Sequence, residues 1–132
     1  MLGGNAPVTI WNRQGNGYYR TEIRTLCRCK LKTDRVVAGA GANIISSLVF
    51  VIPLLENYLP PLEWLGLEDK AGRFTVRVED CIAAGLHPYE IGKDGLTVPR
   101  LREMLAGQFA EVKAVSYNIY AHLGKHVRAE GI

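Results

Sequence analysis

The residues best suited to chemistry in this sequence are cysteines and histidines at short spacings. Cys27 and Cys29 are two positions apart, so both thiols would point the same way on a strand. His122 and His126 are four apart, which suits one helix face, but Gly124 disfavours a helix there. A tetrahedral zinc site needs four such ligands, and a one-residue gap between cysteines is shorter than the usual zinc spacing. We therefore expect no metal and no other cofactor.

Nucleophilic catalysis would require a serine or cysteine beside a histidine that an acid orients. The serines at 46, 47 and 116 lie in strand patterns rather than in a Gly-x-Ser-x-Gly turn. Cys81 follows Asp80, and a neighbouring carboxylate raises the pKa of a thiol instead of activating it. The sequence thus predicts a buried cysteine at this position, and we expect no enzymatic activity. A small enzyme of another class would need a ligand pocket that the sequence does not reveal.

A row of basic residues offers a different chemistry, the binding of phosphate groups. The row occupies one face of the segment 19–31 and consists of Arg20, Arg24, Arg28 and Lys30. Trp11 and Tyr18 are near in sequence, and small β-barrels bind single-stranded nucleic acid with basic grooves and stacking aromatic rings. Glu22 interrupts the row, and a charged strand face also discourages pairing at a sheet edge. Nucleic-acid binding is therefore the alternative function.

The element that carries the basic row is the most regular pattern in the chain. Polar and apolar residues alternate over 19–31, apart from Leu26, as in a half-buried antiparallel strand. A shorter strand is predicted at 8–12, and the glycine-rich turn at 14–17 joins the two as a hairpin. The segment 44–52 is apolar on both faces, which predicts a central strand, and Pro53 ends it.

The remaining elements are short. Strands are predicted at 73–78, continuing towards a turn near Gly85, and then at 89–91, 112–120 and 126–130. One helix is predicted to begin after a capping Thr97, with Pro99 in its first turn, and to end near Gly107. The fold class is therefore mainly β, a small β-barrel or sandwich of about seven strands with one short α-helix that plugs or flanks it.

Length and composition are those of one globular domain, residues 1–132. Hydrophobic residues make up 48% of the chain and charged residues 22%. Three cysteines with no signal peptide before them predict free thiols in a reducing cytoplasm. The longest apolar stretch is far below the roughly 20 residues that span a bilayer, so we expect no membrane partner. Residues 1–42 contain seven Lys or Arg and two Asp or Glu, whereas residues 43–99 contain four and eight.

Four sequence segments, in this order, resemble minor capsid or head-completion (head–tail connector) proteins of tailed phages and prophages of Gram-positive bacteria. They are Thr9-Ile-Trp-Asn12, Ser47-Leu-Val-Phe-Val-Ile-Pro53, the run from Phe74 through Glu79-Asp80-Cys81 to Gly85, and the closing pair Val112-Lys-Ala-Val115 and Lys125-His-Val127 with Asn118 between them. The resemblance implies a virion structural protein that forms a ring with copies of itself and contacts other virion proteins. It also implies location in the virion, with assembly in the host cytoplasm, and it supplies no catalytic residues.

Two loops are the candidate assembly segments under this interpretation. The first, 38–43, has the alternating glycines of a hinge and contains Gly39, Gly41 and Asn43. The second, 53–70, contains Pro60, Pro61 and Trp64. Long loops in small domains often carry function. An arm or loop of one copy could also lie beside a sheet edge of its neighbour.

Overall fold

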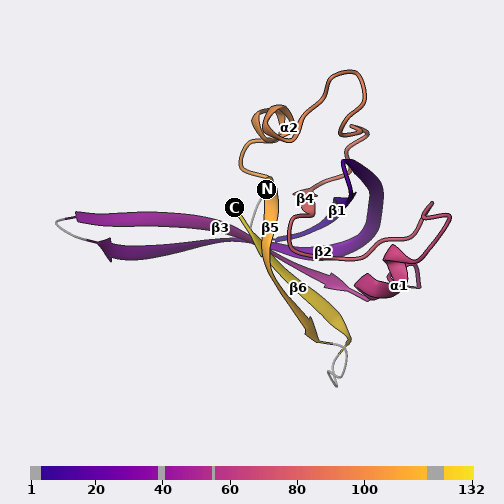
Figure 1. Ribbon diagram of the computed structural model, residues 1–132. Coiled ribbons are helices and arrows are strands. Elements are labelled where there is room, and N and C mark those ends of the chain that lie inside the picture. The colour runs from indigo at the N-terminus through magenta and orange to yellow at the C-terminus, as the bar shows by residue number, and fades with distance from the viewer. Residues whose placement is uncertain (1–3, 39–40, 55, 119–123) are drawn as a thin grey trace.

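The fold is mainly β, a closed barrel of six antiparallel strands with two short helices (Figure 1). The computed structural model describes residues 4–38, 41–54, 56–118 and 124–132, with the backbone alone for residue 4, 33–38 and 41–45. The strands are β1 (Gly4–Gln14), β2 (Gly17–Ala38), β3 (Gly41–Pro53), β4 (Cys81–Ala84), β5 (Phe109–Asn118) and β6 (His126–Gly131), and the helices are α1 (Pro61–Leu65) and α2 (Val98–Met104). Around the barrel the order is β1-β2-β3-β6-β5-β4.

The hairpin predicted at the start of the chain is confirmed. β1 and β2 are antiparallel, and the pair Gln14–Gly17 closes a two-residue turn. Gly15 in this turn has φ +61°, a backbone conformation that suits glycine. On β2 the predicted inner face is buried at Thr21, Ile23, Cys27 and Cys29. Tyr19 and Leu31, predicted on that face, are 44% and 53% exposed.

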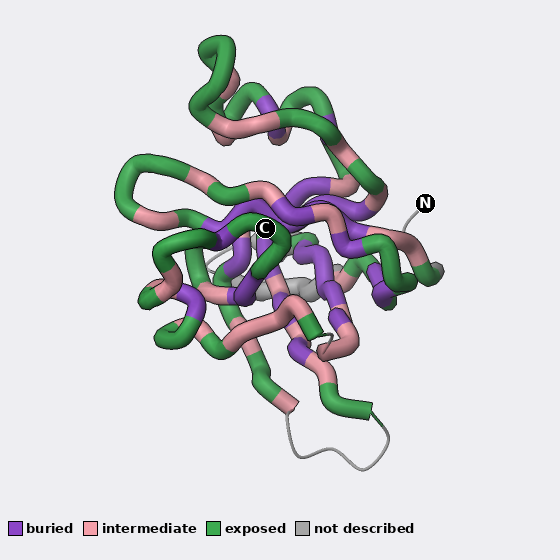
Figure 2. The backbone as a smooth tube through the Cα atoms, turned by 90° about the vertical axis from the view of Figure 1, so that its right-hand side faces the viewer, coloured by how far each residue is buried: buried purple, intermediate pink, exposed green. Residues whose placement is uncertain are grey.

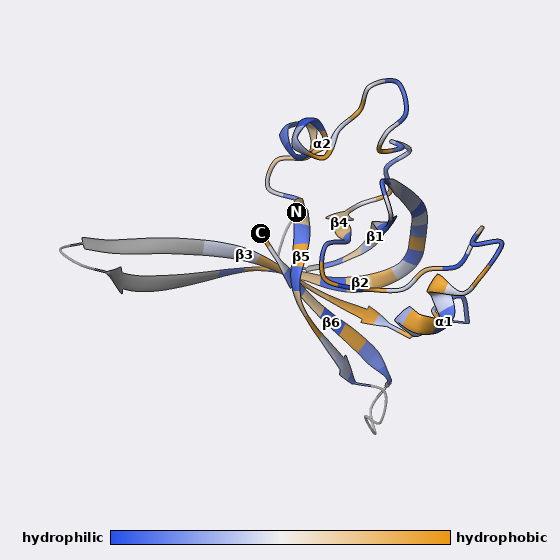
Figure 3. Cartoon of the chain, in the orientation of Figure 1, coloured by the Kyte–Doolittle hydropathy of each residue, from blue (hydrophilic) through white to orange (hydrophobic). Residues whose placement is uncertain are grey.

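The central strand predicted at 44–52 is confirmed for residues 48–52, which lie between β2 and β6 in the barrel wall, whereas residues 44–47 pair with β2 alone. Residues 48–53 of β3 pair with β6, and Leu48, Val49, Phe50 and Ile52 are buried. The predicted strands at 112–120 and 126–130 correspond to β5 and β6, although residues 119 and 120 lie outside the described residues. β6 alternates visibly between polar and apolar residues in Figure 3, as expected of a wall strand with one face in the core.

The barrel has six strands where about seven were predicted, because two of the predicted segments are not strands. Residues 73–78 make one isolated bridge, between Phe74 and Tyr58, although Phe74 and Val76 are fully buried in the barrel core. Residues 89–91 form part of a loop, whereas residues 81–84, predicted to lead into a turn, form β4. Phe74, Thr75 and Val76 are all buried, in a segment that enters the barrel without joining its ladder.

The predicted helix corresponds to α2, and the second helix, α1, lies in the connection between β3 and β4. The Thr97 side chain accepts a hydrogen bond from the backbone N–H of Arg100, and Pro99 lies in the first turn. α2 flanks the barrel instead of plugging it. The cluster beneath it comprises the buried residues Trp11, Cys81, Ala83, Leu101, Leu105 and Phe109. Figure 2 shows the buried residues along the barrel strands and the exposed ones mainly in the outlying loops.

Candidate assembly surfaces

A two-stranded arm extends beyond the barrel and is the most prominent feature of the molecule (Figure 1). β1 stops pairing with β2 at Cys29, and β6 stops pairing with β3 at Leu48. β2 and β3 continue to pair with each other as far as Ala38 and Gly41. Residues 30–38 and 41–47 therefore form a ribbon, here called the arm, with no second strand on either side among the described residues.

The predicted hinge at 38–43 is wrong for the part that the structure describes. Gly41 and Asn43 belong to β3 and pair with Ala38 and Val36 of β2. Gly39 lies outside the described residues. The alternating glycines therefore fall near the tip of a long hairpin, because continuous strand pairing precedes and follows them. Whether this segment contacts another chain stays a prediction.

The second predicted assembly segment is a long connection that packs against the barrel. Trp64 is fully buried, so it anchors α1 and is unavailable as a contact residue. Lys70, only 6% exposed, donates from Nζ to the carbonyl oxygen of Leu67 at 2.6 Å and lies 5.0 Å above the Trp64 ring. Tyr19 contacts Trp64 edge-on, with ring centroids 5.8 Å apart. The lysine charge is thus held by carbonyl dipoles and aromatic faces.

Pro60 and Pro61 lie at the surface of this connection. With Tyr58 and Tyr117 they line a cavity of about 300 Å³. The Tyr117 hydroxyl donates to the carbonyl oxygen of Val76 at 2.7 Å, which fixes its ring. Tyr58 meets the buried Phe74 ring at a centroid distance of 5.7 Å. We call this small apolar cavity the proline pocket. Two of its lining side chains, Tyr58 and Tyr117, are held in place by these contacts with the barrel.

The predicted basic face divides into two parts. Arg20 is largely covered, and its guanidinium contacts Glu22 at 2.8 Å and Glu90 at 2.9 Å. These carboxylates raise the pKa of Arg20, although burial acts in the opposite direction with the largest single effect. Arg24 also pairs with Glu22, at 2.9 Å, but its side chain is 74% exposed. Arg28 and Lys30 are exposed, and neither has an ion pair with a described residue.

The aromatic residues near the basic face are not arranged to stack on bases. Trp11 is fully buried on the outer side of the barrel wall, and its indole N–H donates to the carbonyl oxygen of Tyr89 at 2.8 Å. Its ring packs against Phe109 beneath α2. Tyr18 is partly buried and belongs to the same cluster. Trp11 and Tyr18 therefore do not combine with the basic row to form the predicted surface for stacking bases.

The thiols are placed as inert core residues. Cys27, Cys29 and Cys81 are all free and buried. Burial raises the pKa of Cys27 to about 12, with a further contribution from Cys29. Burial likewise raises the pKa of Cys81 to about 12, helped by the charges of Glu111 and Asp80. The prediction of a buried Cys81 beside an acid that opposes its ionisation is confirmed.

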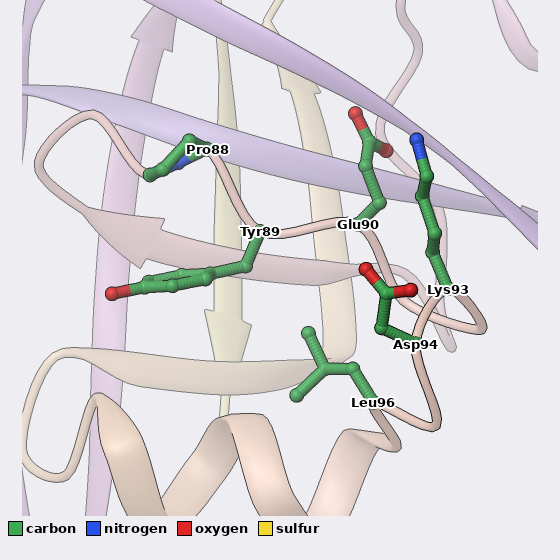
Figure 4. A pocket seen from close by; sticks show the side chains of 6 residues that line it. All are labelled: Pro88, Tyr89, Glu90, Lys93, Asp94 and Leu96. Carbon is green, nitrogen blue, oxygen red and sulfur yellow. The ribbon is translucent and has the colours of Figure 1, made fainter.

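The described residues contain no group of three His, Cys, Asp or Glu side chains positioned for a metal ion. His122, one of the four ligands considered for zinc, lies outside them. A surface cavity of about 390 Å³ is formed by the loop before α2 (Figure 4). Its lining mixes Glu90, Lys93 and Asp94 with Tyr89, Pro88 and Leu96. Figure 4 shows Glu90 and Lys93 pointing to the same side, and Glu90 is already paired with Arg20.

A buried polar cluster that the sequence did not reveal closes one part of the barrel. Asp80 is fully buried and accepts hydrogen bonds from the backbone N–H groups of Arg13 at 2.8 Å and Arg77 at 2.9 Å. Asn12, also fully buried, donates to Asp80 at 2.8 Å and to the carbonyl oxygen of Thr75 at 2.7 Å. Burial raises the pKa of Asp80, while these hydrogen bonds and the Arg77 charge oppose that rise. The cluster joins β1 to the segment before β4.

The comparisons with known proteins bear on the family. The model of a family of unknown function, DUF6751, matches residues 3–132. The chain belongs to this family. No curated protein and no solved structure matches it. The match covers the barrel, the arm and both helices, so the surfaces described above all lie within the family's domain. Among the described residues, no helix combines the length and apolar character needed to cross a bilayer.

Proposed function

We propose that this chain is a structural subunit of a phage or prophage particle, a minor capsid or head–tail connector component that assembles by protein–protein contacts. The arm is the observation that carries the proposal. Two strands by themselves are at best marginally stable in water, and three or more strands, or packing on another element, are usually needed. Beyond its base, where Ser47 and Lys32 contact Glu130 of β6, the arm extends along residues 30–38 and 41–47 with no third strand among the described residues.

The edges of the arm are suited to another polypeptide. Beyond Cys29 on β2 and before Leu48 on β3, the outer hydrogen-bonding groups face no strand among the described residues. Such edges accept an added strand, with backbone hydrogen bonds supplying affinity. A subunit that places a paired arm on a closed barrel can thus join a neighbour without unfolding its own wall. This arrangement supports a role in an assembly, with the virion as its location and the host cytoplasm as the place of assembly.

Mass spectrometry of purified particles tests the proposal. After prophage induction in the host that encodes this chain, particles would be purified by density and the subunit quantified against the major capsid protein. We expect a fixed, low copy number that corresponds to a ring rather than a shell. Particles that form normally and lack the chain would refute the proposal.

Nucleic-acid binding is retained as a second candidate because Arg28 and Lys30 are exposed side by side on one face and unpaired with described residues. The measurement is fluorescence anisotropy with a single-stranded oligonucleotide between 50 and 200 mM salt. If phosphates are bound, affinity falls steeply with salt, and removing one contacting cation lowers the salt slope by about 1. Arg28→Gln would show this change, and the exposed Lys125→Gln is the matched control.

A further inference from the structure

An exposed leucine stands within the basic row on β2. Leu26 is 59% exposed and lies between Arg24 and Arg28, both of which are exposed. Together with Lys30 these residues form what we call the basic ridge. Single exposed leucines are common on protein surfaces and need no explanation by themselves. The backbone beneath this one is unusual, however.

A bulge in the barrel wall lies next to Leu26. Ala6 of β1 pairs with Cys27, but Val8 pairs with Ile23, so four steps along β2 oppose two along β1. Ile23 and Cys27 both remain in the core, and the residues between them, Arg24 to Leu26, are all exposed. Bulges bend a strand and change the direction of its side chains. Leu26 faces outward by alternation with Arg24 and Arg28, and at the bulge Thr25 is exposed as well.

The proline pocket offers the complementary surface. Its lining, from Tyr58, Pro60, Pro61 and Tyr117, is almost entirely apolar, and its volume of about 300 Å³ is at the lower end for ligand cavities. That size suits one or two aliphatic side chains. The hydrogen bond from Tyr117 to Val76 uses the phenolic oxygen, so the ring contributes its apolar surface to the pocket. Leu62, 85% exposed, follows Pro61 directly and extends the apolar area.

Acidic residues accompany the pocket along the chain. Glu56 precedes Tyr58 by two residues and Glu63 follows Pro61 by two, and both are exposed. Glu68 and Asp69 continue the series. None of these four carboxylates has an ion pair with a described residue. The nearest lysine in sequence, Lys70, is buried with its charge directed at backbone carbonyls. The segment around the pocket is thus apolar at its centre and acidic at its margins, opposite in charge to the basic ridge.

We propose that the basic ridge of one copy docks on the proline pocket of a second copy, with Leu26 in the pocket and Arg24 and Arg28 against Glu56 and Glu63. The inference rests on the proposed assembly function and names one contact that serves it. Because ridge and pocket are different surfaces, the contact is heterologous. Contacts of this kind extend from copy to copy and close into a ring when the rotation permits. The two surfaces would also bring together the basic first third and the acidic middle of the chain.

Charge-reversal variants of the full chain test this contact. Arg24→Glu with Arg28→Glu damages the ridge and leaves the pocket intact, whereas Glu56→Lys with Glu63→Lys damages the pocket and leaves the ridge intact. Association would be followed by sedimentation velocity at low and high salt. The wild type should associate with increasing concentration, more weakly at high salt. Each variant alone should lose affinity by about tenfold or more, as expected for central interface residues.

Mixing the two variants gives the decisive result. The intact pocket of the first accepts the intact ridge of the second, and the reversed ridge of the first is complementary in charge to the reversed pocket of the second, so the mixture should associate like the wild type with the two variants alternating. Reversing all four charges in one chain should restore association. The control, Lys93→Glu with Lys125→Glu, changes the net charge by the same amount as the ridge variant at exposed sites and should associate like the wild type. Circular dichroism would verify that every variant is folded.

Three results would overturn the contact: a wild type that stays monomeric, variants that associate normally, or a mixture that remains monomeric. None of these bears on whether the chain is present in particles, which the mass spectrometry decides. Conversely, a chain absent from particles could still show restored association on mixing. Leu26→Asp provides an independent check on the apolar part, with Leu86→Asp as a control at another exposed leucine. Equal effects of these two substitutions would also contradict the assignment.

Discussion

The same two strands, β2 and β3, build both the barrel and the arm, but only in the barrel is each of them paired on both sides. On β2, Cys27 and Cys29 are fully buried, whereas Leu31, two residues further along the same face, is 53% exposed. The strand has not changed its pattern at this point; β1 has ended. The comparison shows that burial is set by which neighbours accompany a strand.

The two regions therefore differ in what maintains them. In the barrel, backbone pairing is accompanied by a packed core and by the Asp80 cluster. In the arm, β2 and β3 pair with each other, and at its base Ser47 and Lys32 also contact Glu130 of β6. Changes in the barrel should therefore appear as lost stability of the isolated chain. Changes in the arm should leave that stability nearly unchanged and affect association.

The largest effect on stability is expected for Asp80→Ala. The substitution leaves the N–H groups of Arg13 and Arg77 and the Asn12 amide without their buried acceptor. Removing one partner of a buried charged network typically costs about 3–5 kcal/mol. Urea unfolding monitored by fluorescence would measure the change. The control is Glu68→Ala, at an exposed carboxylate, which should cost less than about 0.5 kcal/mol. Similar values for the two variants would contradict the role given to the cluster.

A smaller loss is expected for Gly131→Ala, at the place where β6 meets both β3 and β5. Gly131 pairs with Leu48 on one side and Val112 on the other. A Cβ atom there would collide with the backbone carbonyl of Glu111, which cannot move without disturbing the ladder. Overpacking of this kind costs about 1–3 kcal/mol.

The matched control for this substitution is Gly66→Ala, at the end of α1. A Cβ atom at Gly66 would have its nearest neighbours at 3.7 Å, and its φ of −80° suits any residue. The melting temperatures of both variants distinguish two explanations. If the close approach of β5 to Gly131 matters, only Gly131→Ala should melt lower; if any loss of glycine is destabilising, both variants should. If Gly131→Ala melts at the wild-type temperature, β5 and β6 approach each other less closely at this point.

How far the sequence predicts this fold depends on whether side-chain periodicity reports backbone pairing. For β1 and β2 it does, because a glycine turn and a period of two act together. At 73–78 side-chain periodicity does not report backbone pairing. Phe74 and Val76 are buried as in a strand, but the backbone of this segment is hydrogen-bonded by one side chain where a neighbouring strand would be. The Asn12 amide donates to the carbonyl oxygen of Thr75, and its carbonyl accepts from the N–H of Thr75 at 3.3 Å. Asn12 thus satisfies both backbone groups as a neighbouring strand would.

The candidate surfaces were predictable in part. The exposed cations of β2 follow from alternation, but the pairing of Arg20 with Glu90 requires knowledge of a contact 70 residues away. The assignment of Trp64 to an exposed assembly loop failed because long connections were taken to lie at the surface. The cation–aromatic contact that buries Lys70 is equally invisible in a sequence, since lysine is rarely fully buried. The arm was not predicted because the glycines of the segment 38–43 suggest flexibility and the residues that flank this segment show no regular alternation.

The reactivity of thiols distinguishes the part of β2 in the barrel from the part in the arm. With a pKa of about 12, the folded Cys27 and Cys81 thiols stay protonated at pH 8 and should react slowly with a disulfide reagent until the chain unfolds. In the variant Leu31→Cys, on the same face of β2 but beyond β1, the new thiol should react rapidly without unfolding. Rapid labelling of the wild type would show that the barrel opens at β2.

The same thiols give stability a defined dependence on pH. Their pKa values are raised from 9.0 to about 12 by folding, so their contribution is fully present below pH 9 and is lost as pH rises towards 12. In this range the unfolded chain releases protons that the folded chain retains. The urea midpoint should therefore fall between pH 9 and 11, and the fall should be shallower in Cys81→Ala after correction for its lower starting stability.

The smallest effect on stability is expected from shortening the arm. Replacing residues 33–46 by Asn-Gly would join Lys32 to Ser47, which already face each other, through a two-residue turn that favours hairpins. The described core clusters contain no residue from 33–46, so the free energy of unfolding should change by less than about 1 kcal/mol. If the unfolding free energy drops by several kcal/mol, the arm is part of the folding unit. If it stays constant while the chain disappears from particles, stability and assembly are divided between barrel and arm.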